Sequence, residues 1–311
     1  MIVREKPNLF SIFFIVRRGS GSILPRILPQ MLLVMTLSSV VVYGHRHAPD
    51  WVPVVSSAPF ALIGIALSIF LGFRNNACYD RWWEARRQWG TLVIACRNFG
   101  RQTLLLEERG GSEGAHLRIE MVRLVIAFTY ALVQHLRPSK SQPAVPSGLA
   151  TSMSERFLTS RNPPDYLLRQ ITSLLVGART RGLLSDIEFS LIEGTVGQME
   201  TVLGSCERIR STPVPFAYTL LLHRTAYAFC FLLPFGFADL IGWLEPIAAG
   251  MVAYTFFGLD MLGDELEEPF GELPNDLPIA ALAETIAINL REALGETDLP
   301  PFPEPVNYVL M

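Results

Sequence analysis

Four long apolar stretches stand out in the hydropathy pattern of this 311-residue chain. They cover residues 24–44, 52–73, 216–238 and 241–262, and the second of them holds no charged residue. Because a helix needs roughly 20 apolar residues to cross a bilayer, the pattern predicts four transmembrane helices. Charged side chains lie within or beside the last two stretches, which are therefore expected to pack against neighbouring helices or water.

Residues 74–212, between the second and third spans, are predicted to form a helical region outside the membrane. Apolar residues recur at helical spacing over 80–106, which indicates that the second span continues as a helix, and a further helix is expected over 116–136. The Pro- and Ser-rich stretch 138–164 is typical of a linker or surface loop.

The stretch 165–210 is also expected to be helical, with a break near Gly182. Ser185 and Glu188 have the spacing of a capping box, which marks the start of a helix. No stretch shows the alternation of a strand, and no internal repeat is visible. The sequence therefore predicts an all-α fold in which residues 1–311 form one unit that ends in an acidic segment at 263–311.

Positive charge predicts the orientation of the spans, because cytoplasmic loops are rich in Lys and Arg. Such residues flank the first span on its N-terminal side and the second span on its C-terminal side: Arg4, Lys6, Arg17, Arg18, Arg26, Arg74, Arg81, Arg86 and Arg87. The connection between these spans holds only Arg46. We therefore expect both termini and residues 74–212 to lie in the cytoplasm, with no removed signal peptide.

Composition excludes several classes of protein. Half of the residues are apolar, 18% are charged, the net charge is −3 and the mean hydropathy is +0.32, which argues against a disordered chain or a basic nucleic-acid binder. Four widely spaced cysteines indicate free thiols in a reducing compartment rather than a disulfide framework or a zinc site. No nucleophile elbow, HExxH motif or phosphate-binding glycine loop is present, so an enzyme is not expected.

Two stripes run along the second span. Ile65, Ile69 and Phe73 recur every four residues, and a small-residue stripe of Gly64, Ser68 and Gly72 runs beside them. In one interpretation the bulky stripe contacts lipid and the small stripe is ordinary helix packing. In the other, the bulky stripe lines a pore, where rings of apolar side chains form a hydrophobic constriction.

Pro213 and Pro215 predict a helix break just before the third span. The break is either a loop that enters a helix or a place where free carbonyls face an ion path. Another candidate site lies around the turn Pro269–Gly271, where the carboxylates of Glu265, Glu268 and Asp276 offer ligands to a cation such as calcium. Because EF-hand spacing is absent, a solvated helix end is the preferred interpretation of these carboxylates.

Several motifs together resemble the bestrophin family, closest to its short bacterial members. The motifs, in chain order, are Ala58-Pro59-Phe60, Phe70-Leu71-Gly72-Phe73-Arg74-Asn75-Asn76, Arg81-Trp82-Trp83-Glu84-Ala85-Arg86, Thr212-Pro213-Val214-Pro215 and Glu267-Glu268-Pro269-Phe270-Gly271. The resemblance implies a homopentamer around one axial ion pore, with four membrane helices in each subunit and a helical cytoplasmic region. It also implies a bacterial inner-membrane protein whose partners are further copies of itself, the lipid bilayer and the permeant ions.

The same resemblance assigns roles to individual residues. The family's hydrophobic neck falls on Ile65, Ile69 and Phe73, and the cytoplasmic constriction of bacterial members falls on Ile187. Leu273 stands where animal bestrophins have a carboxylate that helps to hold calcium, so calcium-dependent opening is not expected here. The proline-rich tail from Asp298 is expected to be an extended arm on neighbouring subunits.

The function that we expect from this reasoning is a passive channel for small monovalent ions. The family label favours chloride or another anion, although a monovalent cation remains an alternative for bacterial members because the neck carries no charge. A secondary transporter and a non-conducting membrane assembly protein are the competing functions; the absence of internal sequence repeats disfavours the transporter.

Overall fold

The computed structural model describes residues 1–3, 21–52, 55–137 and 151–311, and these residues fold almost entirely into helices. The helices are α2 (Leu24–His47), α3 (Ala58–Gln102), α4 (Leu104–Leu136), α5 (Thr151–Thr159), α6 (Pro163–Thr180), α7 (Asp186–Ser211), α8 (Phe216–Ile241), α9 (Glu245–Glu267) and α10 (Ile279–Ala293). Two short 3₁₀ turns, Pro49–Trp51 and Gly242–Leu244, follow α2 and α8. The expected all-α class is confirmed for the described residues, whose only β pairs are isolated bridges near the chain ends.

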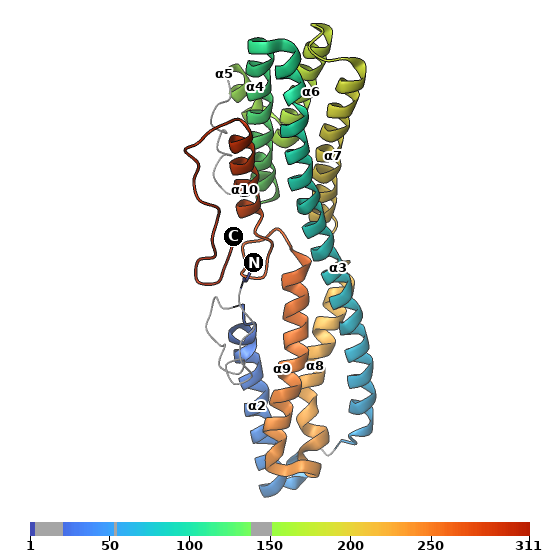
Figure 1. Ribbon diagram of the computed structural model, residues 1–311. Coiled ribbons are helices and arrows are strands. Elements are labelled where there is room, and N and C mark those ends of the chain that lie inside the picture. Colours follow the sequence, from blue (N-terminus) through green and yellow to red (C-terminus); the bar gives the residue numbers. More distant parts are fainter. Residues whose placement is uncertain (4–20, 53–54, 138–150) are drawn as a thin grey trace.

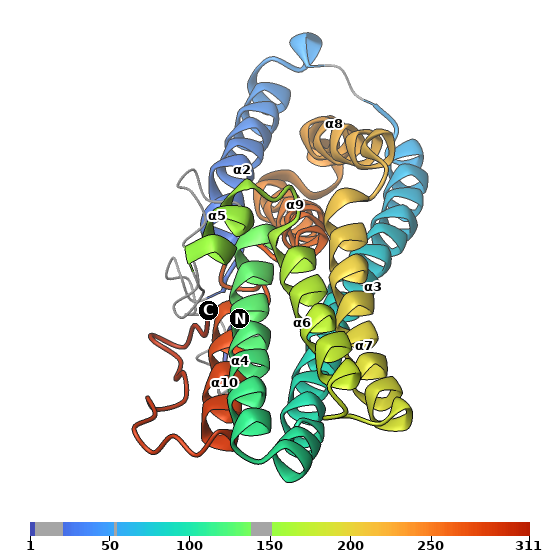
Figure 2. The ribbon, with the colours of Figure 1, turned by 90° about the horizontal axis from the view of Figure 1, so that it is seen from above.

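The helices form two bundles stacked along α3 (Figure 1). The span bundle consists of α2, α8, α9 and the first half of α3; seen from above, α8 and α9 lie between α2 and α3 (Figure 2). The head bundle consists of the second half of α3 with α4, α5, α6, α7 and α10. Because α3 has 45 residues and no proline beyond its first turn, it runs as one helix of about 68 Å through both bundles.

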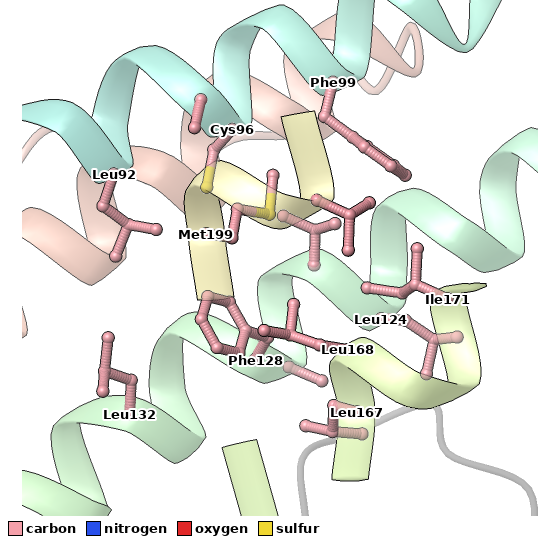
Figure 3. Packing of buried hydrophobic residues seen from close by; sticks show 14 of the residues in the cluster. Leu92, Cys96, Phe99, Leu124, Phe128, Leu132, Leu167, Leu168, Ile171 and Met199 are labelled. Carbon is pink, nitrogen blue, oxygen red and sulfur yellow. The ribbon is translucent and has the colours of Figure 1, made fainter. Parts of the chain in front are cut away.

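Apolar residues are buried very differently in the two bundles. The head bundle has a dense core, in which side chains from α3, α4, α6 and α7 interlock (Figure 3). The labelled members of this core are Leu92, Cys96, Phe99, Leu124, Phe128, Leu132, Leu167, Leu168, Ile171 and Met199. The span bundle leaves most of its apolar surface exposed, as expected for helices that meet lipid or further subunits.

The stretches long and apolar enough to cross a membrane are Leu24–His47, Ala58–Gln102, Leu104–Leu136 and Phe216–Glu267, the last of which contains α8 and α9. The third of these stretches is α4, which the sequence placed outside the membrane. In α4, 56% of the most apolar window is buried within the chain, against 17–28% in the other three stretches. The apolar face of α4 therefore packs into the core of the head bundle.

Within the head bundle, most of the expected local structure is present. The second span continues without interruption as α3, the capping box of Ser185 and Glu188 begins α7, and the break before it contains Gly182 at φ +73°. All four cysteines are free and buried.

Two expectations about the head bundle need correction. The helix expected over 116–136 is present and ends at Leu136, but α4 already starts at Leu104, and Gly111, at φ +52°, kinks it between the short segment 104–110 and the longer remainder. The linker expected over 138–164 contains α5 and the start of α6, which begins with prolines at positions where a helix tolerates them. Residues 138–150 of that linker lie outside the described residues, as do Arg4, Lys6, Arg17 and Arg18.

Beyond α10, residues 296–311 form no helix, in agreement with the proline-rich composition. The end of this arm contacts its own chain. The Leu310 amide donates to the Met1 carbonyl, and the Ala281 amide donates to the Met311 carbonyl, each at 2.9 Å. The two termini therefore lie side by side between the bundles (Figure 1).

Candidate functional site

The bulky stripe on α3 lies on the outside of the subunit. Ile65, Ile69 and Phe73 are 61%, 51% and 61% exposed. At 100° per residue, their mean direction is about 180° from that of the buried residues Leu67 and Leu71, which pack against α8 and α9. The three side chains therefore form a bare apolar face directed away from the rest of the subunit.

The small-residue stripe lies on the flank of the same helix and is only partly used within the subunit. At Gly64, a Cβ atom would lie 3.2 Å from the ring of Phe229 in α8, so this glycine allows close packing. The Ser68 hydroxyl donates to the Gly64 carbonyl at 2.8 Å. At Gly72 a Cβ atom would meet nothing within 4 Å, so the flank is open at its Gly72 end.

A charged cluster lies directly behind Phe73. Arg74 is fully buried, and its guanidinium donates to Asp260 Oδ1 at 2.9 Å and to Asp264, with Glu267 Oε2 at 3.5 Å. Asp260 also contacts His223 Nδ1 at 2.6 Å. This cluster therefore joins α3, α8 and α9 at the level of the stripe.

Sequence reasoning missed this cluster because it counted Arg74 only as a charge that orients the second span. A signal was available in α9. Asp260, Asp264 and Glu267 are spaced by four and three residues, which places their carboxylates on one face of a helix. Such a face needs a cation as its partner, but the spacing does not identify Arg74 in α3 as that cation.

The prolines Pro213 and Pro215 occupy the short connection between α7 and α8, and Pro215 is the N-cap residue of α8. The carbonyls freed at this break already have donors. Arg81 donates to the carbonyls of Ile209 and Thr212, and to that of Glu267 at 2.7 Å. The geometry thus favours a loop that enters a helix over carbonyls directed at an ion path.

Ile187 lies in the first turn of α7 and is 83% exposed. The capping box fixes this turn, since the Ser185 amide donates to Glu188 Oε2 at 2.7 Å. A single isoleucine near a helix start is usually a core residue, and here it is not. Its side chain is free to meet another molecule.

The three carboxylates considered for calcium do not assemble into one centre. Glu265 accepts from Arg26 and from the Asn275 amide, each at 2.6 Å, and Glu268 is exposed. Asp276 accepts from the Leu273 amide at 2.6 Å, and burial raises its pKa to about 6. Across the described ranges, no group of three His, Cys, Asp or Glu residues is arranged to hold a metal ion.

Comparison with known proteins agrees with this architecture. A family model described as Bacterial/Fungal Bestrophin protein matches residues 1–292. A voltage-dependent anion channel-forming protein of Mesorhizobium japonicum is 40% identical over 296 residues, which cover 95% of this chain and 93% of that protein. The Escherichia coli K12 protein YneE, with the same description, is 37% identical over 300 residues and 96% of each chain.

A solved structure extends the likeness to three dimensions. The crystal structure of a bacterial bestrophin homolog from Klebsiella pneumoniae is 37% identical and superimposes with a TM-score of 0.81. The match covers 87% of this chain and 99% of that one. Both the order of the helices and their packing are therefore similar in the two proteins.

Proposed function

The chain belongs to the bacterial bestrophin family, and from this premise we propose that it is a passive channel that conducts small monovalent ions, anions first, through a homopentameric pore. Membership places it among channel-forming membrane proteins rather than enzymes. Its relatives are named as voltage-dependent anion channels, so an anion current that responds to voltage is the expected activity.

One observation carries the proposal. One face of α3 packs against the rest of the subunit, and the opposite face is apolar and exposed. Ile65, Ile69 and Phe73 project from α3 in the direction away from α8 and α9. Around a symmetry axis, such faces form successive apolar rings, which narrow the pore and control its wetting. The open flank at Gly72 supports the assembly, because small residues let a neighbouring helix approach closely.

The neck carries no charge, so it does not select the sign of the ion by electrostatics. We assign Ile187 to a second apolar ring in the head bundle, which its exposure supports. The charge distribution of the sequence supports an inner-membrane orientation with the head bundle and both termini in the cytoplasm.

The decisive experiment records the purified protein in planar bilayers. Under a chloride gradient, the reversal potential gives the sign of the permeant ion, and unitary current steps separate a channel from a transporter or an assembly protein. The variant Ile65→Ala/Ile69→Ala/Phe73→Ala should widen the neck and raise unitary conductance severalfold.

A matched control distinguishes a pore face from a lipid face. Ile63 and Phe70 are also exposed on α3, about 110° around the helix from the stripe. Ile63→Ala/Phe70→Ala should leave the unitary conductance unchanged. Equal conductance in the triple variant, the control and the parent would show that the stripe does not line the pore.

A further inference from the structure

The head and span bundles meet at a cleft of about 600 Å³ that the proposed conduction path does not use. We call it the junction cleft. Its walls come from the C-terminal ends of α4 and α7, from α3 and from the loop that follows α9. Three arginines line it: Arg81, Arg137 and Arg210.

Backbone carbonyls hold all three guanidinium groups in place. Arg137 donates to the carbonyls of Phe270 and Leu277, each at 2.8 Å, and Arg210 donates to the carbonyl of His135. Arg81 donates to the carbonyls of Ile209 and Thr212, just before the helix break, and to that of Glu267 at the end of α9. These bonds fix the directions of the arginines without neutralising their charges.

The lining of the cleft holds more arginines than carboxylates. No Asp or Glu oxygen of the described residues lies within 4.0 Å of a guanidinium nitrogen of Arg81, Arg137 or Arg210. The lining itself carries two carboxylates, the exposed Glu268 and Glu272, while Glu267 and Asp276 lie behind it and also attract Arg81 and Arg137. Burial lowers the pKa of the Arg81 and Arg137 guanidinium groups by more than the neighbouring carboxylates raise it.

Arginines at helix ends often have a purely structural role, because they donate to the last carbonyls of a helix. That role accounts for only part of the hydrogen-bonding capacity here. A guanidinium has five N–H donors. Arg137 uses two nitrogens and Arg210 one, which leaves donors that a bidentate acceptor such as phosphate matches in geometry.

We propose that the junction cleft binds the phosphate of an anionic phospholipid headgroup. The loop that lines it begins at Glu268, immediately after α9 leaves the span bundle, so the cleft lies at the depth of the headgroups. Basic pockets between helices at this depth are suited to anionic lipids. An anionic headgroup is favoured over a zwitterionic one, because the zwitterionic headgroup would bring its own cation beside three guanidinium groups. The proposal is independent of whether the chain conducts ions.

The test uses the full-length, assembled protein in detergent and measures bound lipid by native mass spectrometry. Phosphatidylglycerol is titrated against phosphatidylcholine, and inorganic phosphate is titrated separately by its effect on the melting temperature. Arg137→Gln/Arg210→Gln should weaken phosphatidylglycerol binding about thirtyfold, since each arginine near a membrane surface contributes about a factor of five. Arg137→Lys/Arg210→Lys should retain most of the binding because it keeps both charges.

Arg208→Gln is the matched control, since Arg208 lies in the last turns of α7 but pairs with Glu84 outside the junction cleft. It should bind phosphatidylglycerol like the parent. If the double Gln variant fails to assemble, the single variant Arg210→Gln, whose side chain is exposed, should still lose about fivefold. Equal binding of both lipids, or an unchanged affinity in the Gln variants, would overturn the proposal. A response to inorganic phosphate alone would overturn the assignment to lipid.

Discussion

Replacing Arg74 by methionine should destabilise the subunit strongly, because the charge cluster behind the proposed neck residue Phe73 depends on this one guanidinium. Arg74 is fully buried and contacts Asp260, Asp264 and Glu267. Methionine keeps an unbranched chain of similar length but supplies neither charge nor donors. Asp260, whose side chain is 6% exposed, would then keep His223 as its one side-chain partner among the described residues.

The expected magnitude follows from the burial of both partners. Breaking a buried ion pair by removing one member costs about 3–5 kcal/mol, because the other charge stays buried and uncompensated. Asp264 adds little to this cost, since its side chain is 49% exposed and water can solvate it. Arg74→Met should therefore lower the free energy of unfolding by about 3–5 kcal/mol, chiefly through Asp260.

Chemical unfolding of the purified protein in detergent micelles measures this effect. The control is Arg101→Met, because Arg101 is exposed and, among the described residues, its side chain hydrogen-bonds only to Asn98; its effect should stay within about 0.5 kcal/mol. The double variant Arg74→Met/Asp260→Asn should be more stable than Arg74→Met alone, since it removes the stranded carboxylate. The reasoning fails if Arg74→Met behaves like Arg101→Met, or if the two changes in the double variant simply add.

Three further predictions concern other parts of the chain. Ile187→Ala should change unitary conductance or ion preference while the elution volume of the assembled protein stays constant; a variant with parental currents would contradict the second ring. Truncation after Gly295 should lower the melting temperature and the fraction of assembled protein in detergent, and an identical mass distribution would count against a role for the arm. Open probability should not change as cytoplasmic calcium rises from nanomolar to millimolar, and a steep rise that is lost in Asp276→Ala would refute this expectation.

Features that depend on local pattern were predictable from the sequence. The apolar stretches, the continuation of α3 and the capping box at Ser185 each rest on residues within a few turns of one another. α5 was missed because it lies in a Pro- and Ser-rich stretch whose composition is typical of loops. The start of α4 was misplaced because Gly111 interrupts its apolar periodicity.

Contacts between distant segments were not predictable in this way. Arg74 and Asp260 are separated by 186 residues, and nothing in either local pattern specifies that they meet. The same holds for the junction cleft, where residues from α3, α4 and α7 surround the loop after α9. The outward stripe on α3 was predictable only in part. Its periodicity is visible in the sequence, but its direction depends on which face of α3 is covered by α8 and α9.

The placement of these features along α3 constrains how the neck could respond to the head bundle. Phe73, Arg74 and Arg81 lie within about 12 Å of one another along the helix axis. Arg74 joins this segment to α9, and Arg81 joins it to the connection before α8. Because α3 has no interior proline and the charge cluster around Arg74 ties it to α9, a rotation of its head-bundle half is carried to Phe73 rather than absorbed by a bend. A ligand in the junction cleft would lie against Arg81, which is eight residues along this helix from Phe73.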